Sequence, residues 1–334
     1  MGLMGFGRTT DSDAEHGAPP AVPGDDPSAG DASKVNKFRR HLHAWWEGYY
    51  LDDPNAAEHA PPPEKPVTEE EKKNDKWSAE RIKVAELIWG DGFTFPGGAD
   101  HVLRMVKPMT LTSAKSMLDI GCGLGGATRA IAKTFGTWVI GMEASPALAA
   151  AGMRYSEAGG LAKRAPIQHF DPATVELPGK KFDAICLRNI FSSIPDKRRL
   201  LVQAERALKP TGSILLSDFA LSKQGAKSEA LATWSAAEDH PPQPCTLDDF
   251  KQNFESLKLD TRVAEDMTAE FRGIVVQGWA NLASILQGKS VDPGEATALA
   301  KEIKLWQLRL AALDSGDLRV VRLFALKRSG GPKA

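Results

Sequence analysis

The chain has 334 residues, of which 42% are hydrophobic and 25% charged, an ordinary composition for a globular protein. Its net charge is −1, whereas a dedicated nucleic-acid binder usually carries a basic field, so we expect no nucleic-acid partner. The three cysteines are far apart and form no CxxC or Cys/His set, so we expect neither a disulfide framework nor a metal site. No apolar run approaches the ~20 residues of a membrane span, and the N-terminus lacks a signal-peptide pattern. These features predict a cytoplasmic protein.

The N-terminal region divides into two parts by composition. Residues 1–34 are rich in Gly, Ala, Pro, Asp and Ser and predict a disordered tail. Residues 35–112 predict a helical lid followed by an aromatic loop. Within the lid, the basic segment 34–51 carries apolar residues at helical spacing, namely Phe38, Leu42, Trp45, Trp46 and Tyr49. This segment fits three interpretations: a helix docked on its own domain, a peripheral contact with an anionic membrane surface, or a partner-binding helix.

Two further elements are expected before the main domain. Thr68 and Glu71 have the spacing of a capping box, and we expect a helix from there to about Trp89. Residues 88–98 then combine four glycines with a proline and three aromatic side chains, which predicts a tight loop. This loop is either a hydrophobic plug between helices or one wall of a ligand pocket. Another helix is expected over 99–110.

The most informative stretch of the sequence is 117–126, where an apolar run ends in Asp119 and is followed by a turn crowded with glycine. Glycine allows the backbone to turn with positive φ and lets a ligand approach the main chain closely. The helix expected after the turn offers free N–H groups and a positive dipole end. The stretch therefore predicts a strand, loop and helix that hold a nucleotide-like ligand.

The rest of the chain alternates strands and helices. Strands are predicted at 115–120, 138–142, 167–170, 182–187, 213–217, 261–264 and 318–326. Helices are predicted at 127–135, 146–158, 197–208, 223–240, 247–257, about 268–287 and about 293–313. This alternation predicts an α/β fold over 113–330 with a Rossmann-like, doubly wound, mostly parallel sheet of about seven strands, a helical insertion at about 268–313, and the ligand at the carboxyl ends of the strands.

The glycine spacing alone leaves the ligand open, because Gly121, Gly123 and Gly126 formally satisfy the dinucleotide pattern. Asp119 favours another ligand, since a carboxylate would repel a phosphate and attract an ammonium group. S-adenosylmethionine carries an ammonium and a sulfonium and no phosphate. A nicotinamide-dependent dehydrogenase remains the less favoured alternative.

At these residues the sequence resembles the class I S-adenosylmethionine-dependent methyltransferases. The loop 118–125 looks like their first motif. Glu143 ends the second strand, where that family places the acid that binds both ribose hydroxyls, and Asp171 follows the third strand, where the family contacts the adenine amino group. The resemblance implies S-adenosylmethionine as the cofactor, with these residues around it: Asp119, Gly121, Cys122, Gly123, Gly125, Glu143, Ala144, Asp171, Pro172 and Asn189.

A narrower resemblance is to the phosphoethanolamine N-methyltransferase-like group, which carries a methyltransferase type 11 domain. It rests on the loop 89–98, the helix start 246–250 and the segment 265–268. That group implies an N-terminal lid, an acid and a histidine after the fourth strand, and tyrosine and arginine side chains on the phosphate. Here Asn189 and Ser193 occupy the positions of the acid and the histidine, so the resemblance carries over the fold and the cofactor but not the phosphobase substrate.

An amine acceptor must lose a proton before it can attack, because an ammonium group has no lone pair. His240 and Asn189 are our candidate catalytic residues, and Asp218, Glu238 and Asp239 are further possible proton acceptors. His169 is expected to be a packed strand residue. Five aromatic residues could surround a methylated ammonium by cation–π contact, although core packing explains them equally well: Tyr49, Trp89, Phe93, Phe95 and Trp234.

The sequence therefore predicts an S-adenosylmethionine-dependent methyltransferase that acts on a small amine or a lipid head group, with N-methylation favoured. The absence of the acid and the histidine after the fourth strand motivates one alternative, an S-adenosylmethionine-binding protein without transferase activity. The oligomeric state does not follow from the sequence.

Overall fold

The computed structural model describes residues 66–287 and 290–328. These residues lie in one compact unit of the chain, Glu58–Ala334. The predicted tail and the segment 34–51, which includes Tyr49, lie outside the described residues, so the lid stays a prediction.

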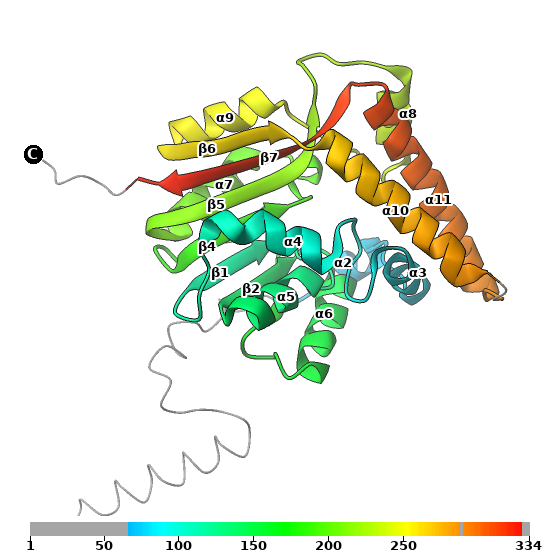
Figure 1. The fold of residues 1–334 in the computed structure, drawn as a ribbon, viewed down its shortest axis with the longest axis horizontal. Helices are drawn as coiled ribbons and strands as arrows, with labels where there is room; N and C mark the ends of the chain where they lie inside the picture. Colours follow the sequence, from blue (N-terminus) through cyan, green and yellow to red (C-terminus); the bar gives the residue numbers. More distant parts are fainter. Residues whose placement is uncertain (1–65, 288–289, 329–334) are drawn as a thin grey trace, which may run out of the picture. The chain divides into compact units, whose positions relative to one another are not determined.

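A seven-stranded sheet of strand order β3-β2-β1-β4-β5-β7-β6 forms the centre of the described chain (Figure 1). The strands are β1 (Ser116–Ile120), β2 (Trp138–Glu143), β3 (Ile167–His169), β4 (Phe182–Arg188), β5 (Leu208–Leu221), β6 (Leu259–Asp266) and β7 (Leu318–Lys327). The first five strands pair in parallel, β7 pairs antiparallel with β5, and β6 pairs antiparallel with β7. The predicted fold class, a Rossmann-like and mostly parallel α/β sheet, is confirmed.

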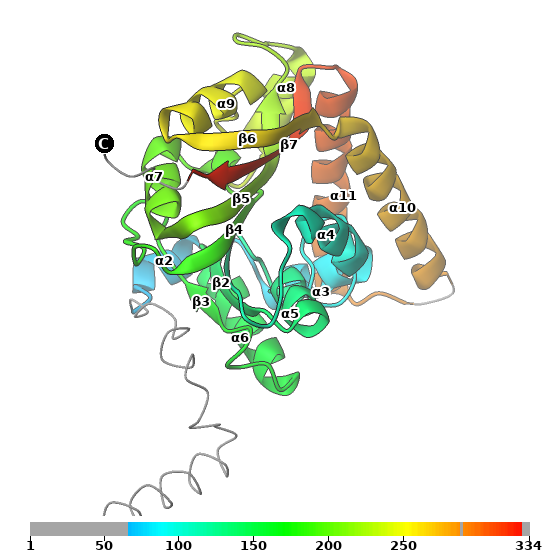
Figure 2. The same cartoon turned by 60° about the vertical axis from the view of Figure 1, so that its left-hand side comes forward.

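Helices cover both faces of this sheet, which is why the central strand β1 is buried along its whole length. Met117 packs on the face covered by α4 (Gly98–Val106), the short 3-10 turn η1 (Lys107–Met109) and α5 (Gly126–Phe135). Leu118 and Ile120 point to the opposite face, against α7 (Lys197–Ala207) and α9 (Leu247–Ser256). Figure 2 shows α4 and α7 on opposite sides of the strands. Helix α6 (Pro146–Ala158) packs beside β3 and β2, and η2 (Phe191–Ser193) follows β4.

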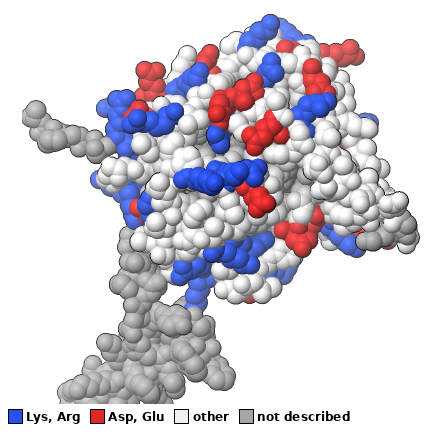
Figure 3. All heavy atoms as spheres, in the orientation of Figure 1, with Lys and Arg blue, Asp and Glu red and all other residues white. Residues whose placement is uncertain are grey.

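A separate helical layer stands at one end of the sheet. It contains α3 (Ala79–Trp89), α8 (Glu229–Ala237), α10 (Thr268–Leu286) and α11 (Pro293–Asp314), and Figure 1 shows α3 beside the long α10 and α11. Its core is aromatic, with the rings of Trp89 and Trp306 only 4.8 Å apart. None of the described helices is long and apolar enough to cross a membrane. On the face shown in Figure 3, acidic and basic side chains are interspersed.

The helix expected from Thr68 to Trp89 is interrupted, which corrects the sequence prediction. The capping box is present, since Thr68 Oγ1 accepts from the Glu71 N–H at 3.2 Å and Glu71 Oε2 accepts from the Thr68 N–H at 2.7 Å. However, the first helix, α2 (Glu69–Asn74), ends at Asn74, because Asp75 adopts an extended conformation and Ser78 caps the new helix α3. The intervening segment, 75–78, reaches the edge of the functional site described below.

The predicted boundaries also differ at β5 and α8. Strand β5 extends to Leu221, well beyond the predicted 213–217, because Asp218–Leu221 pair with β7 after the pairing with β4 has ended at Ser217. Helix α8 is shorter than predicted and covers only Glu229–Ala237. Both differences arise from tertiary contacts that local sequence patterns do not encode.

Candidate functional site

The glycine loop between β1 and α5 is held in a sharp turn by backbone hydrogen bonds. The N–H groups of Gly121 and Cys122 both donate to the Met142 carbonyl oxygen, at 2.9 and 3.2 Å. Gly121 has φ +77°, and a Cβ there would lie 2.4 Å from the Arg188 carbonyl oxygen. Only glycine fits this position, because a side chain would collide with the end of β4, and Gly121 lines a cavity described below.

The aromatic loop after α3 packs directly on the glycine loop. The Gly126 N–H donates to the Gly92 carbonyl oxygen at 2.9 Å, and a Cβ on Gly126 would lie 2.4 Å from that oxygen. Thr94 lies beside Gly123. The loop thus contacts the glycine loop closely, and Phe95 contributes to the cavity walls described below.

Glu143, at the end of β2, faces the glycine loop. Its Oε2 accepts from the Gly123 N–H at 2.8 Å, and its Oε1 accepts from the Ser145 N–H at 2.9 Å. Burial raises the pKa of this carboxyl, and the hydrogen bonds to its oxygens oppose that shift. The side chain is therefore fixed in orientation, while each oxygen keeps a lone pair for a further donor.

Asp171 follows β3 at the same edge of the sheet. Its Oδ1 accepts from the Ala173 N–H at 2.9 Å and its Oδ2 from the Thr174 hydroxyl at 2.7 Å, the pattern of an Asx turn. Asp171, Glu143 and Ala144 line a cavity of about 630 Å³ together with the segment 68–77.

A second cavity of about 260 Å³ continues from the first. Residues of both include Trp77, Glu143, Ala144, Ser193, Asp239 and His240. The second adds Gly121, Gly123 and Asn189. We call the two cavities together the main cleft. Cys122 and Pro172 are next to its lining residues in the chain and Gly125 lies two residues after Gly123, so the structure brings most of the predicted cofactor residues to one place.

Asp119 lies below the cleft rather than on its wall, and it has a partner that the sequence did not reveal. It is fully buried, and the Arg188 guanidinium binds both of its oxygens, with Nη2 at 3.0 and 2.9 Å. Thr128 adds a hydrogen bond of 2.8 Å. Because Arg188 neutralises this carboxylate, the argument that Asp119 attracts a ligand ammonium by its charge is incomplete.

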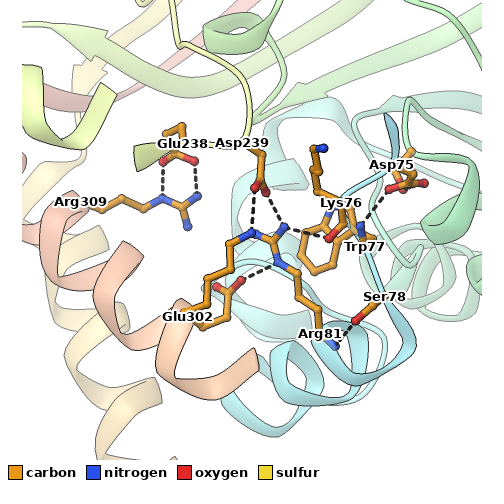
Figure 4. Close-up of polar contacts among 11 residues, drawn as sticks. Asp75, Lys76, Trp77, Ser78, Arg81, Glu238, Asp239, Glu302 and Arg309 are labelled. Carbon is orange, nitrogen blue, oxygen red and sulfur yellow. Dashed lines mark hydrogen bonds and ion pairs between the residues drawn. The ribbon is translucent and has the colours of Figure 1, made fainter. Parts of the chain in front are cut away.

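The far side of the main cleft is lined by charged side chains that form a network with Lys301. We call the whole network the charged wall: Arg81, Glu238, Asp239, Lys301, Glu302 and Arg309. Figure 4 labels all of its members except Lys301. Arg81, from α3, donates to Glu302 of α11 at 2.7 Å and to Asp239. Lys301 also donates to Asp239, at 2.9 Å.

The remaining pair of the charged wall is bidentate, because Arg309 donates through Nε and Nη2 to Glu238 at 2.7 and 2.8 Å. Burial would raise the pKa of Asp239, but its bonds to Arg81 and Lys301 outweigh burial and lower it. Glu238 and Asp239 were candidate proton acceptors, yet both are engaged by cations.

Asp218, the other candidate acid, holds a turn in place. It is fully buried and accepts from the Phe191 N–H at 2.7 Å and the Phe219 N–H at 2.8 Å. Burial raises its pKa. It thereby fixes the start of η2, next to Asn189, which has φ +51° and lines the cleft. His240 is exposed and lines both cavities of the cleft.

The predicted aromatic pocket separates into different environments. Trp89 and Trp234 are buried in the core of the helical layer, and Phe93 packs against two core clusters. None of these three lines the main cleft, whereas Phe95 does. His169 is buried in β3 as expected, with Nε2 3.9 Å from Glu71.

Sequence reasoning missed the contribution of the segment 75–78. Asp75 Oδ2 accepts from the Ser145 hydroxyl and the Ala147 N–H, both at 2.8 Å, which ties this segment to the first turn of α6 beside Glu143. Trp77 enters both cavities as a result. The sequence does contain a sign of the break between α2 and α3: an Asn-Asp pair is followed by Ser78, a residue type that commonly caps the start of a helix. Within 66–287 and 290–328, no group of three or more His, Cys, Asp and Glu side chains could hold a metal ion.

Comparison with known proteins agrees with this geometry. Residues 95–260, about half of the chain, match a methyltransferase domain family. Phosphoethanolamine N-methyltransferase 1 of Zea mays is 29% identical over 202 residues, which are 60% of this chain and 39% of that protein. The chloroplastic tocopherol O-methyltransferase of Arabidopsis thaliana is 28% identical over 238 residues, 60% of this chain and 68% of that protein.

Solved structures show the same fold. Haemonchus contortus phosphoethanolamine N-methyltransferase 2, in complex with S-adenosyl-L-methionine, superposes with a TM-score of 0.69 at 22% identity, covering 80% of this chain and 62% of that one. The chain spans about two fifths of the Zea mays relative. From the domain match and the fold together, the chain belongs to the class I S-adenosylmethionine-dependent methyltransferases.

Proposed function

We propose that this chain binds S-adenosylmethionine in the main cleft and transfers its methyl group to a small amine, free or as part of a lipid head group. One observation carries the proposal: the glycine loop, Glu143 and Asp171 all meet at one cleft, which continues past Asn189 to His240. The cleft therefore has room for a donor at one end and an acceptor at the other.

The residues present fit the donor. Glu143 is fixed by two backbone N–H groups and keeps lone pairs for two ribose hydroxyls. Gly121 and Gly123 line the second cavity, where the donor would lie against their main chain, and Asp171 lines the first cavity and would accept a hydrogen bond from the adenine amino group. Cys122 is buried and burial raises its pKa well above the ordinary thiol value, so it contributes a neutral surface and no nucleophile.

S-adenosylmethionine supplies a methyl carbon already activated by a sulfonium. The protein's task is then to orient the acceptor, exclude water and remove a proton from an ammonium group. We assign orientation to Asn189, Trp77 and Phe95, which line the second cavity. His240 is positioned to accept a proton at the mouth of the cleft, and it stays a proposed catalytic residue together with Asn189.

The charged wall favours a small polar acceptor. It places three cations and three carboxylates beside the second cavity, so it presents both signs of charge with no net excess. A cavity of about 260 Å³ suits a group of a few heavy atoms. An amine that carries an anionic group would match both signs.

The test is methyl transfer from radiolabelled S-adenosylmethionine to ethanolamine, phosphoethanolamine, sarcosine and vesicles containing phosphatidylethanolamine. We expect label in at least one amine, and mass spectrometry of the product identifies the methylated nitrogen. Label on a hydroxyl oxygen instead would contradict N-methylation. Tight donor binding without any labelled product would support the alternative, a binding protein without transferase activity, and binding of NADH in place of the donor would support a dehydrogenase.

A further inference from the structure

A third, narrow cavity lies next to the main cleft, and we call it the inner cavity. Its walls include His101, Arg188, Ser217 and Phe271, and it shares Phe95 and Asn189 with the cleft. Its volume is about 30 Å³, which is enough for a water molecule. The inner cavity thus places His101, a histidine that was not among the sequence-based candidates, in a cavity that shares two wall residues with the acceptor end of the cleft.

His101 is held in place by the turn that precedes it. Gly97 starts α4 with φ +122°, and a Cβ on Gly97 would lie 2.7 Å from Cδ2 of the His101 ring. The ring therefore occupies the space that any larger residue at position 97 would fill. Phe95, two residues earlier, packs its ring 5.5 Å from Phe271 and fixes the same wall.

A carboxylate faces the imidazole. Oε1 of Glu270, in the first turn of α10, lies 3.3 Å from Nδ1 of His101. If Nδ1 carries the proton and faces Glu270, Nε2 of the neutral ring is a proton acceptor. A histidine with one nitrogen held by a carboxylate and the other free to react is the arrangement of a general base.

Burial and two neighbouring arginines favour the neutral form of His101. Burial lowers its pKa below the ordinary value, Glu270 opposes that shift, and Arg104 on α4 and Arg188 on β4 add to it. A neutral imidazole can accept a proton, and Glu270 would stabilise the imidazolium that results.

We propose that His101, oriented by Glu270, accepts the proton that an ammonium acceptor must lose before methyl transfer, directly or through one water in the inner cavity. This inference rests on the proposed function. In the step, an N–H bond of the ammonium breaks and an Nε2–H bond forms, which leaves the amine lone pair free to attack. After product release the Nε2 proton passes to solvent through the cleft, which restores the neutral ring with Nδ1–H towards Glu270.

The replacement of two residues after β4 removes the acid and the histidine that the resembled group implies there. Where the resembled group implies an acid and a histidine, this chain has Asn189 and Ser193, and neither is a base at neutral pH. His101 and Glu270 come instead from α4 and α10 and reach the same side of Asn189 through the inner cavity.

The first part of the test needs no turnover. The histidine ring signals of the full chain are titrated by NMR, and His101→Gln assigns the resonance of His101. We expect a pKa below the ordinary histidine value, a further decrease in Glu270→Gln, an increase in Arg104→Gln, and no change in the control Glu229→Gln, an exposed acid in the first turn of α8. A His101 pKa that does not respond to Glu270→Gln overturns the orienting role.

The second part measures turnover with ethanolamine and phosphoethanolamine as acceptors and donor affinity by calorimetry. We expect His101→Gln to lower kcat about 100-fold, a size usual for loss of a general base, with the donor Kd unchanged. Glu270→Gln, which changes an exposed residue and so leaves the fold intact, should move the acidic limb of the kcat/KM pH profile to lower pH.

The outcomes separate this inference from the proposed function. In one outcome the wild-type protein binds the donor and methylates an amine, His101→Gln keeps the wild-type kcat and the acidic limb of the pH profile, and His240→Gln loses both. The His101 inference is then wrong and the proposed function stands. If the wild-type protein does not bind the donor, the proposed function is wrong and the inference falls with it.

Discussion

The two sides of the main cleft are built in different ways. The glycine-loop side comes from consecutive segments of β1, α5 and β2, and its key contacts join residues close in sequence, such as Gly123 and Glu143. The charged wall joins α3, the segment 238–239 and α11, and its Arg81–Glu302 bond spans 221 positions. The first side is therefore set by local backbone geometry, and the second by tertiary packing of the helical layer.

This difference gives separate predictions for the two sides. Changes on the glycine-loop side should affect donor binding together with stability. Changes in the charged wall should affect stability and acceptor binding and leave the donor affinity near its wild-type value.

The largest effect is expected from Arg188→Met. It removes the guanidinium from Asp119, which is fully buried, and leaves an uncompensated charge below the glycine loop. Such a loss lowers the free energy of unfolding by about 3–5 kcal/mol, measured by urea denaturation. The double variant Asp119→Asn with Arg188→Met should recover most of that loss, and a double variant as unstable as the single one would contradict the pairing.

Gly121→Ala should be nearly as damaging. Its φ of +77° and the Arg188 carbonyl oxygen at 2.4 Å leave no room for a methyl group, so we expect a loss of about 2 kcal/mol or more and no measurable donor binding. Gly179→Ala is the control, because the nearest atom to a Cβ there lies at 3.7 Å. Equal Tm and donor affinity in the two variants would show that the glycine loop is not constrained as described.

Glu302→Gln tests the charged wall. It weakens a charge-assisted bond to the buried Arg81 side chain, while Asp239 remains as a partner, so we expect a loss of about 1.5 kcal/mol. The donor Kd should not change, whereas the KM of the acceptor should rise. A variant that loses donor affinity instead would remove the distinction between the two sides.

The smallest effect is a dependence of stability on pH from Asp218. Burial raises its folded pKa above 3.8, so the folded state holds this proton more tightly than the unfolded state does. Its contribution is present below 3.8 and is lost as the pH rises through the folded pKa. Asp218→Asn should therefore make the free energy of unfolding depend less on pH above pH 3.8. Urea denaturation at several pH values measures this. A wild-type minus variant difference that grows with pH would contradict the sign.

The sequence was sufficient for the features that depend on local patterns. The strand and helix alternation predicts the sheet, and the positions of Gly121, Glu143 and Asp171 follow from where their strands end. The break at Asp75 was missed because the helical pattern continues through it, and it is tertiary contact with Ser145 and Ala147 that ends α2. The Asp119–Arg188 pair and the charged wall were missed because nothing in a single sequence indicates which distant charges meet.

The aromatic residues show the same limit. Trp89, Phe95 and Trp234 are alike in the sequence, yet only Phe95 lines the cleft, because α3 packs against α10 and α11 and buries Trp89, and α8 packs against α11 and buries Trp234. His101 was missed for a related reason, since it lies on a helix of the predicted lid and gains its meaning only from Glu270 and the inner cavity.

The most direct test of the central claim is calorimetric titration of S-adenosylmethionine into the wild-type protein, Glu143→Gln and the control Glu157→Gln, an exposed residue of α6. Loss of charge-assisted hydrogen bonds to the ribose should weaken binding by about 1.5–3 kcal/mol, or roughly ten- to hundredfold in Kd, for Glu143→Gln alone. Equal affinity of all three proteins, or no binding by the wild type, would contradict the assignment of the main cleft as the donor site.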